Sequence, residues 1–165
     1  MIYILTGPIR SGKTTALAHW SSDKTYVDGI LSPDDASGKR YFYALKAQHS
    51  FPFEAETDTV EDLIEIGRFK FLKTAFEQAN VYLCQAITKA ETRLVVLDEL
   101  GKLELHSLGL YDAARRLIQD CQDSKDLHLM LVIRDSLLDP VLDCFRITNY
   151  VLLDTDSLYS LSLSI

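Results

Sequence analysis

The chain contains five short apolar runs, each followed by a charged residue or by turn-forming residues. Most of these runs are continuous, which is typical of strands covered on both faces, and such strands belong to parallel sheets. We therefore predict strands at residues 2–6, 25–31, 94–97, 127–133 and 150–153.

The segments between these runs repeat their apolar residues at helical spacing. This period predicts helices at residues 13–22, about 59–89, 108–121 and 136–144. In the longest segment one face carries the apolar residues expected to pack into the core, namely Phe69, Leu72, Phe76, Ala79 and Leu83. The alternation of strand and helix predicts an α/β fold with a mainly parallel sheet.

Two segments depart from this alternation. Residues 29–47 hold the turn-forming sequence PDDASG between two extended stretches, which predicts a β-hairpin inserted after the second strand. In the tail, polar residues alternate with Leu161, Leu163 and Ile165, and this period of two predicts an added edge strand.

The length and composition of the chain limit its organisation. A chain of 165 residues with 47% hydrophobic and 25% charged residues suffices for one well-buried core, so we predict a single domain over residues 1–165. The apolar runs are too short to cross a bilayer, and no membrane association is expected. The apolar N-terminal stretch lacks a basic leader and predicts a first strand, not a secretion signal.

The net charge and the spacing of the cysteines and histidines disfavour some classes of function. The formal net charge of -7 and the pI near 5.0 weigh against a broad nucleic-acid-binding surface, but they permit a local basic pocket for a phosphate ligand. The three cysteines are far apart, and the four histidines lack the spacings of metal sites. We therefore expect buried free thiols and a cytoplasmic protein.

A phosphate-binding loop follows the first predicted strand. Gly7 to Thr14 match the pattern GxxxxGK(S/T), with a strand before the loop and a helix after it. The residues expected to surround the phosphates are Gly7, Pro8, Ile9, Arg10, Ser11, Gly12, Lys13, Thr14 and Thr15. We expect Lys13 to reach the outer phosphates as a catalytic residue and the Thr14 hydroxyl to bind Mg²⁺. The alternative is an incidental glycine turn, which the position between strand and helix disfavours.

Two acids end the central apolar run, in the sequence LVVLDE. Burying a carboxylate costs several kcal/mol unless a cation or a proton accompanies it, so Asp98 and Glu99 indicate a positive partner. Nucleotide-bound Mg²⁺ is the simplest partner: Asp98 would bind the metal, and Glu99 would orient or deprotonate the attacking water. The alternative is a strand that ends in solvent and begins a helix, where acids are favoured in the first turn.

Four basic residues are candidates for contacting the γ-phosphate. Arg134 follows the fourth predicted strand, where ligands of open α/β sheets collect, and we predict a catalytic role for it over a surface ion pair. For Arg10, Arg40 and Lys102 we expect solvated or ion-paired positions.

These motifs resemble the THEP-type small P-loop nucleoside triphosphatases. GPIRSGKTT is similar to the phosphate loop of that family and LVVLDELGKLEL to its acidic segment, while GILSPDDASGKRYFYAL and LVIRDSLLDPVLDCF are weaker matches in family order. The chain departs from the family pattern at Asp34 and Ile133, and residues 50–71 match poorly. The resemblance implies a three-layer, RecA-like P-loop domain.

The resemblance also implies an activity. It predicts slow, Mg²⁺-dependent hydrolysis of nucleoside triphosphates to diphosphate and phosphate, with little preference for the base. Two alternatives remain open: a P-loop kinase of a nucleotide or small molecule, and a nucleotide-binding switch with negligible turnover.

Overall fold

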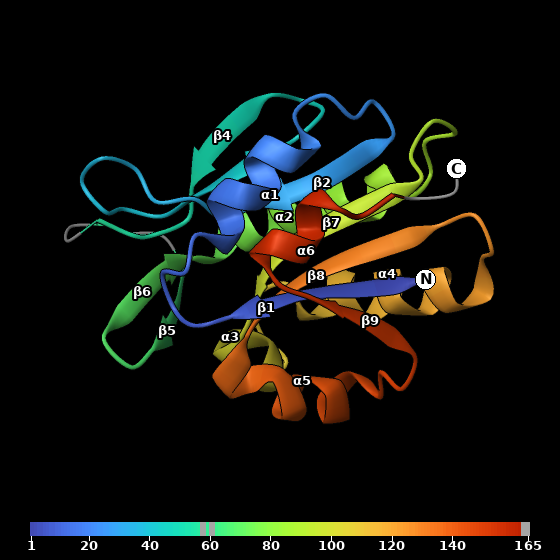
Figure 1. Ribbon diagram of the computed structural model, residues 1–165. Helices are drawn as coiled ribbons and strands as arrows, with labels where there is room; N and C mark the ends of the chain where they lie inside the picture. Colours follow the sequence, from blue (N-terminus) through green and yellow to red (C-terminus); the bar gives the residue numbers. More distant parts are fainter. Residues whose placement is uncertain (57–58, 60–61, 163–165) are drawn as a thin grey trace.

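The computed structural model describes residues 1–56, 59 and 62–162. Its centre is a seven-stranded sheet with the strand order β4-β3-β2-β7-β8-β1-β9 (Figure 1). The strands of this sheet are β1 (Ile2–Gly7), β2 (Val27–Leu31), β3 (Tyr41–Ala44), β4 (His49–Pro52), β7 (Leu94–Leu100), β8 (His128–Arg134) and β9 (Tyr150–Leu153). All five predicted strands are therefore present within a few residues of their expected bounds.

The central part of the sheet is parallel. β1 pairs in parallel with β8 and β9, and β7 pairs in parallel with β2 and β8, whereas β3 and β4 add to β2 as an antiparallel hairpin. The carboxyl ends of β1, β2, β7 and β8 consequently meet at one edge of the sheet, where open α/β sheets bind their ligands. The inserted hairpin and the mainly parallel sheet are both confirmed.

Helices cover both faces of the sheet. α1 (Lys13–Ser21) and α6 (Thr155–Tyr159) pack on one face, with Leu17, Trp20 and Leu158 buried against alternate residues of the parallel strands. α2 (Lys73–Ala86), α4 (Tyr111–Asp123) and α5 (Leu138–Phe145) bury the other face (Figure 1). The short α3 (Lys102–Leu105) and the 3-10 turn η1 (Asp135–Leu137) complete the order. The three-layer α/β architecture is as predicted.

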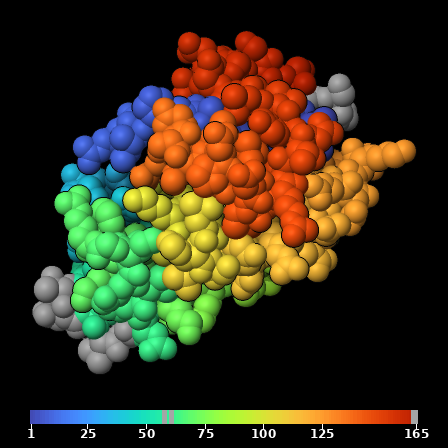
Figure 2. Space-filling model, turned by 90° about the horizontal axis from the view of Figure 1, so that it is seen from below, coloured from blue at the N-terminus to red at the C-terminus, as the bar shows by residue number. Residues whose placement is uncertain are grey.

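The prediction of one long helix at about residues 59–89 is wrong for its first half. Residues 63–72 form a two-stranded antiparallel hairpin outside the main sheet, β5 (Leu63–Ile66) and β6 (Phe69–Leu72), and only α2 is helical. Seen from below, this hairpin lies beside the chain around α3 (Figure 2). Apolar residues there alternate with Glu65 and Lys70, so a period of two was present inside the segment.

Two smaller expectations concern the tail and the thiols. Thr155–Tyr159 of the tail form α6, which Asp154 caps by accepting a hydrogen bond from the Ser157 amide at 2.8 Å. Of the alternating residues for which an edge strand was predicted, 161–162 lie in neither helix nor strand and 163–165 lie outside the described part, so that strand stays a prediction. The thiols are not uniformly buried, since Cys144 is exposed and only Cys121 is fully buried.

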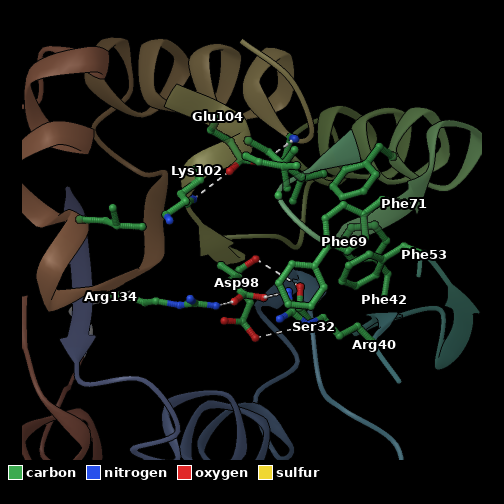
Figure 3. A pocket seen from close by; sticks show the side chains of 18 of the residues that line it. Ser32, Arg40, Phe42, Phe53, Phe69, Phe71, Asp98, Lys102, Glu104 and Arg134 are labelled. Atoms are coloured by element: carbon green, nitrogen blue, oxygen red, sulfur yellow. Dashed lines mark hydrogen bonds and ion pairs between the residues drawn. The ribbon is translucent and has the colours of Figure 1, made fainter. Parts of the chain in front are cut away.

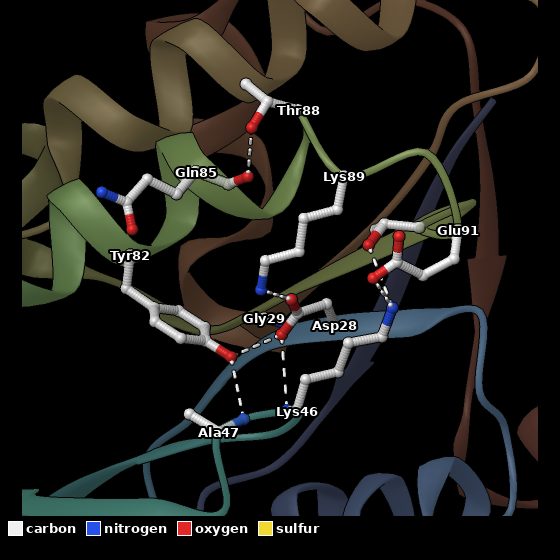
Figure 4. Close-up of polar contacts among 10 residues, drawn as sticks. Asp28, Gly29, Lys46, Ala47, Tyr82, Gln85, Thr88, Lys89 and Glu91 are labelled. Atoms are coloured by element: carbon white, nitrogen blue, oxygen red, sulfur yellow. Dashed lines mark hydrogen bonds and ion pairs between the residues drawn. The ribbon is translucent and has the colours of Figure 1, made fainter.

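A buried acid joins β2 to α2 and the following turn (Figure 4). Asp28, which is fully buried, accepts hydrogen bonds from Tyr82 and Lys89, both at 2.7 Å, and from the Gly29 amide. Burial raises the pKa of this carboxyl, but the hydrogen bonds from Lys89, Tyr82 and Gly29 outweigh it and hold the pKa below its usual value. Asp28 therefore stabilises the fold as a paired anion, away from the phosphate loop.

Candidate active site

The phosphate loop connects β1 to α1 in the way the motif requires. Gly12 lies just before α1 with φ of 84°, a left-handed conformation that favours glycine. Lys13 is buried, and its Nζ donates hydrogen bonds to the Gly7 carbonyl at 2.9 Å, the Pro8 carbonyl at 2.6 Å and Ser11 Oγ at 3.2 Å. Burial and the nearby Arg134 lower the pKa of Lys13. The ammonium group is thus directed back across the loop.

A bulge in β7 gives the acidic pair its geometry. Leu97 pairs with Leu131 and Leu100 with Ile133, so β7 contains one more residue than β8 over the same interval. Glu99 occupies the bulge with φ of 70°, which is rare for a residue with a side chain. In a regular strand Asp98 and Glu99 would point to opposite faces; here both line the same cavity.

Asp98 is buried at the carboxyl end of β7. Its Oδ2 accepts a hydrogen bond from the Ser32 amide at 3.0 Å, and its backbone carbonyl accepts one from Ser32 Oγ at 3.3 Å. Burial raises the pKa of Asp98 to about 6, and Glu99 acts in the same direction, while Ser32, Thr14 and Lys13 act against them. Thr14 lines the same cavity as the Asp98 carboxylate.

Glu99 is held by two arginines. Arg134, at the end of β8, forms an ion pair with Glu99 Oε1, and Arg40 Nη1 lies 4.0 Å from Glu99 Oε2. The labelled guanidinium groups approach the carboxylates from opposite sides in Figure 3. Arg40 also lies over the ring of Phe69, 4.8 Å from its centroid. Arg134 therefore points into the site, and Arg40, for which a solvated or ion-paired position was expected, is paired with the same glutamate.

These groups surround one cavity of about 690 Å³ at the carboxyl edge of the sheet. Its lining includes Ile9, Arg10, Ser11, Gly12, Lys13, Thr14 and Thr15 of the loop, together with Asp98, Glu99 and Arg134. Gly7 and Pro8 face Lys13 through their carbonyl oxygens. A volume of this size is within the range of small-molecule sites. The residues predicted from two distant motifs are thus brought together.

Other candidates from the sequence occupy less central positions. Asp34 lines the cavity and its backbone pairs with Arg40 in an isolated bridge, and Lys102 lies beyond the acidic pair, in the lining of an adjoining cavity. Sequence reasoning missed Ser32 and also Arg68 and Phe69, which reach the cavity from the tip of the β5–β6 hairpin. The Gly67-Arg68 pair between two alternating stretches was the available signal for that hairpin.

The donor set suits a hard divalent cation. The Thr14 hydroxyl and the buried Asp98 carboxylate offer oxygen ligands, which Mg²⁺ prefers, and a triphosphate would supply further oxygens. Among the described residues no group of three or more His, Cys, Asp or Glu is arranged to hold a metal ion without a ligand. Thr14 and Asp98 therefore fit the two protein positions at which the P-loop motif holds its metal.

The fold and the loop define a class of protein. A mainly parallel sheet with a GxxxxGK(S/T) loop after its first strand, and an acid near the end of another parallel strand, β7, which β8 separates from β1, is the P-loop nucleoside-triphosphatase fold. The sequence profile of the family described as NTPase (NTPase_1) matches residues 2–153. The chain belongs to this NTPase family, and this membership supports nucleoside-triphosphatase activity in general.

Comparison with solved structures agrees with this assignment. The chain is similar to the crystal structure of THEP1 from the hyperthermophile Aquifex aeolicus, with a TM-score of 0.73, 21% sequence identity, and coverage of 94% of this chain and 90% of that one. The resemblance to THEP-type proteins predicted from the motifs is thereby confirmed. No curated protein matches the chain. In the described part of the chain, no helix is long and apolar enough to cross a membrane.

Proposed function

We propose that the protein hydrolyses nucleoside 5'-triphosphates to the diphosphate and phosphate, slowly, with Mg²⁺ and with broad base tolerance. The observation that carries the proposal is the shared cavity: the loop residues, Asp98, Glu99 and Arg134 face one space that is large enough for a nucleotide. Bound Mg²⁺ would be held by Thr14 and Asp98 and would neutralise charge on the phosphates.

The proposed reaction gives a separate role to each of three side chains, Lys13, Glu99 and Arg134. Lys13, now bonded to loop carbonyls, would exchange those acceptors for phosphate oxygens when the nucleotide enters. Glu99 would orient the attacking water and accept its proton, and Arg134 would stabilise negative charge on the γ-phosphate. Arg134 and Arg40 both pair with Glu99, and these ion pairs would compete with its action as a base, which is consistent with slow turnover.

Broad base tolerance follows from where the contacts lie. The charged side chains that line the cavity include Lys13 of the phosphate loop, the carboxylates Asp98 and Glu99, and the arginines Arg40 and Arg134, which suit a phosphate chain and its metal. Phosphates, which are common to all nucleotides, would therefore provide most of the binding energy. The same arrangement makes a nucleoside triphosphate the expected partner, and the cytoplasm is the proposed location.

The experiment is a phosphate-release assay with ATP, GTP, CTP and UTP, in Mg²⁺ and in EDTA. Glu99→Gln should lower turnover by about 10²- to 10⁴-fold while nucleotide affinity is retained, because a positioned general base contributes about that much. Lys13→Ala should weaken both binding and turnover. Glu77→Gln, an exposed glutamate on α2, is the matched control and should leave both unchanged.

Two outcomes would contradict the proposal. Equal turnover in the wild type and Glu99→Gln would remove the assignment of the base. Turnover that is undetectable in the wild type despite tight nucleotide binding would instead favour the binding switch.

A further inference from the structure

A second cavity shares part of its wall with the first, and Figure 3 shows the side chains that line it. Its volume is about 240 Å³, and its lining includes none of the loop residues 7–15. The two cavities have in common Ser32, Arg40, Arg68, Phe69, Asp98, Glu99 and Arg134. Glu99 and the two arginines therefore stand at the boundary between the nucleotide cavity and this second space.

The inner part of the second cavity is apolar and aromatic. Phe42, Phe53, Phe71 and Phe76 come from different parts of the chain and pack on one another, with ring centroids of Phe42 and Phe53 4.1 Å apart. The remaining apolar side chains of the wall include Ile66, Leu103, Leu110 and Leu137. Of the charged groups in its lining, Arg40, Glu99 and Arg134 are shared with the nucleotide cavity, whereas Lys102 and the buried Glu104 line this cavity alone.

This arrangement exceeds what hydrolysis requires. An attacking water occupies the space of one small molecule, whereas an apolar cavity of about 150 Å³ already admits benzene. A concave space of this size that is lined mainly by apolar and aromatic side chains, with a few polar groups beside the reacting residues, has the character of a small-molecule site. Its dimensions suit one ring with one or two small substituents, and its boundary suits a polar substituent directed at Glu99.

We propose that this cavity binds a one-ring alcohol and that the protein transfers the γ-phosphoryl group to its hydroxyl. This inference rests on the proposed binding of a nucleoside triphosphate at the loop. The hydroxyl oxygen forms a bond to the γ-phosphorus, and the bond from that phosphorus to the β–γ bridging oxygen breaks. The diphosphate leaves with the electron pair, and Glu99 accepts the hydroxyl proton and later returns it to solvent. Without the alcohol, water takes its place, which gives slow hydrolysis.

The first test is direct binding and transfer by the wild type. Phenol, benzyl alcohol and 3-(hydroxymethyl)pyridine are incubated with the protein, Mg²⁺ and ATP labelled at the γ-phosphate, and the label is separated into inorganic phosphate and phosphate ester. Binding of 4-fluorobenzyl alcohol is followed by ¹⁹F NMR, with an expected Kd on the order of 1 mM for so small a ligand. The expected result is label in an ester of at least one probe.

The second test fills the cavity. Leu103→Trp should lower the ratio of ester to inorganic phosphate by about tenfold or more and weaken probe binding, because its side chain occupies the space of the ring. Leu137→Phe is a smaller change on another element of the same wall and should act in the same direction if Leu103→Trp does not fold. Leu108→Trp, at an exposed leucine outside both cavities, is the matched control and should change neither quantity.

The outcomes separate this inference from the proposed hydrolysis. If phosphate is released but no probe binds and no ester forms, the alcohol site is refuted while the hydrolase stands. If Leu103→Trp instead changes the discrimination among ATP, GTP, CTP and UTP, the cavity receives the base and the inference is again refuted. If no nucleotide binds at all, the proposed function itself fails.

Discussion

The perturbation Asp98→Asn tests the electrostatics of the site without any ligand. The Asp98 carboxyl is buried, and its pKa of about 6 lies above the ordinary value of 3.8. At about 1.4 kcal/mol per pH unit, the difference corresponds to roughly 3 kcal/mol. Asparagine keeps an oxygen that can accept the Ser32 amide hydrogen bond and removes the charge, so the variant isolates the cost of ionisation.

The sign of the pH effect follows from proton binding. The folded protein holds the Asp98 proton more tightly than the unfolded chain does, so raising the pH from about 4 to above 6 removes stability that is fully present at low pH. Without metal and nucleotide, Asp98→Asn should therefore match the wild type near pH 4. Near pH 8 the variant should be more stable by up to about 3 kcal/mol.

The assay is urea unfolding of both proteins from about pH 4 to about pH 8. Other titrating groups are common to the two proteins and cancel in the difference of their unfolding free energies. Adding Mg²⁺ with a non-hydrolysable nucleotide should stabilise the wild type more than the variant. A difference that does not change with pH, or a variant less stable near pH 8, would refute the reasoning.

Three further predictions concern other residues. Arg134→Gln should lower kcat in the phosphate-release assay by about a thousandfold or more, whereas Arg115→Gln on the exposed face of α4 should not. Asp28→Asn should cost about 2 kcal/mol or more in urea unfolding near pH 7, and the loss should shrink as the pH falls through the lowered pKa of Asp28. Gly29→Ala should cost about 3 kcal/mol or more, because φ is 131° and the new Cβ would collide with the Val96 backbone; unfolding no more easily than the wild type would contradict that geometry.

Most strands of the central sheet could be predicted from the sequence, because buried parallel strands appear as continuous apolar runs. The Leu94 run and the Leu127 run needed no tertiary information to be recognised. The phosphate loop was equally readable, since its glycines, its lysine and its threonine have fixed spacing. The site could be anticipated because parallel strands must end at the same edge.

The rest depended on contacts that are distant in sequence. The β5–β6 hairpin was hidden because its residues merge into the helical period of α2, and its stability comes from packing Phe71 against Phe53 and Phe76. The bulge at Glu99 could not be predicted, because the apolar pattern of β7 does not change there. Arg40 reaches Glu99 only through the pairing of β3 with β2, so its place beside Arg134 could not be read from spacing.

The position of the β5–β6 hairpin has a consequence for engineering the protein. It contributes Ile66, Arg68 and Phe69 to the walls of the cavities and takes no place in the central sheet. Hydrogen bonds from the Leu72 amide to the Phe53 carbonyl and from the Ala55 amide to the Lys70 carbonyl fix it to the segment after β4. New side chains at the tip of this hairpin would therefore change what is admitted next to the reacting groups, while the strands that carry the phosphate loop and Asp98 keep their own sheet.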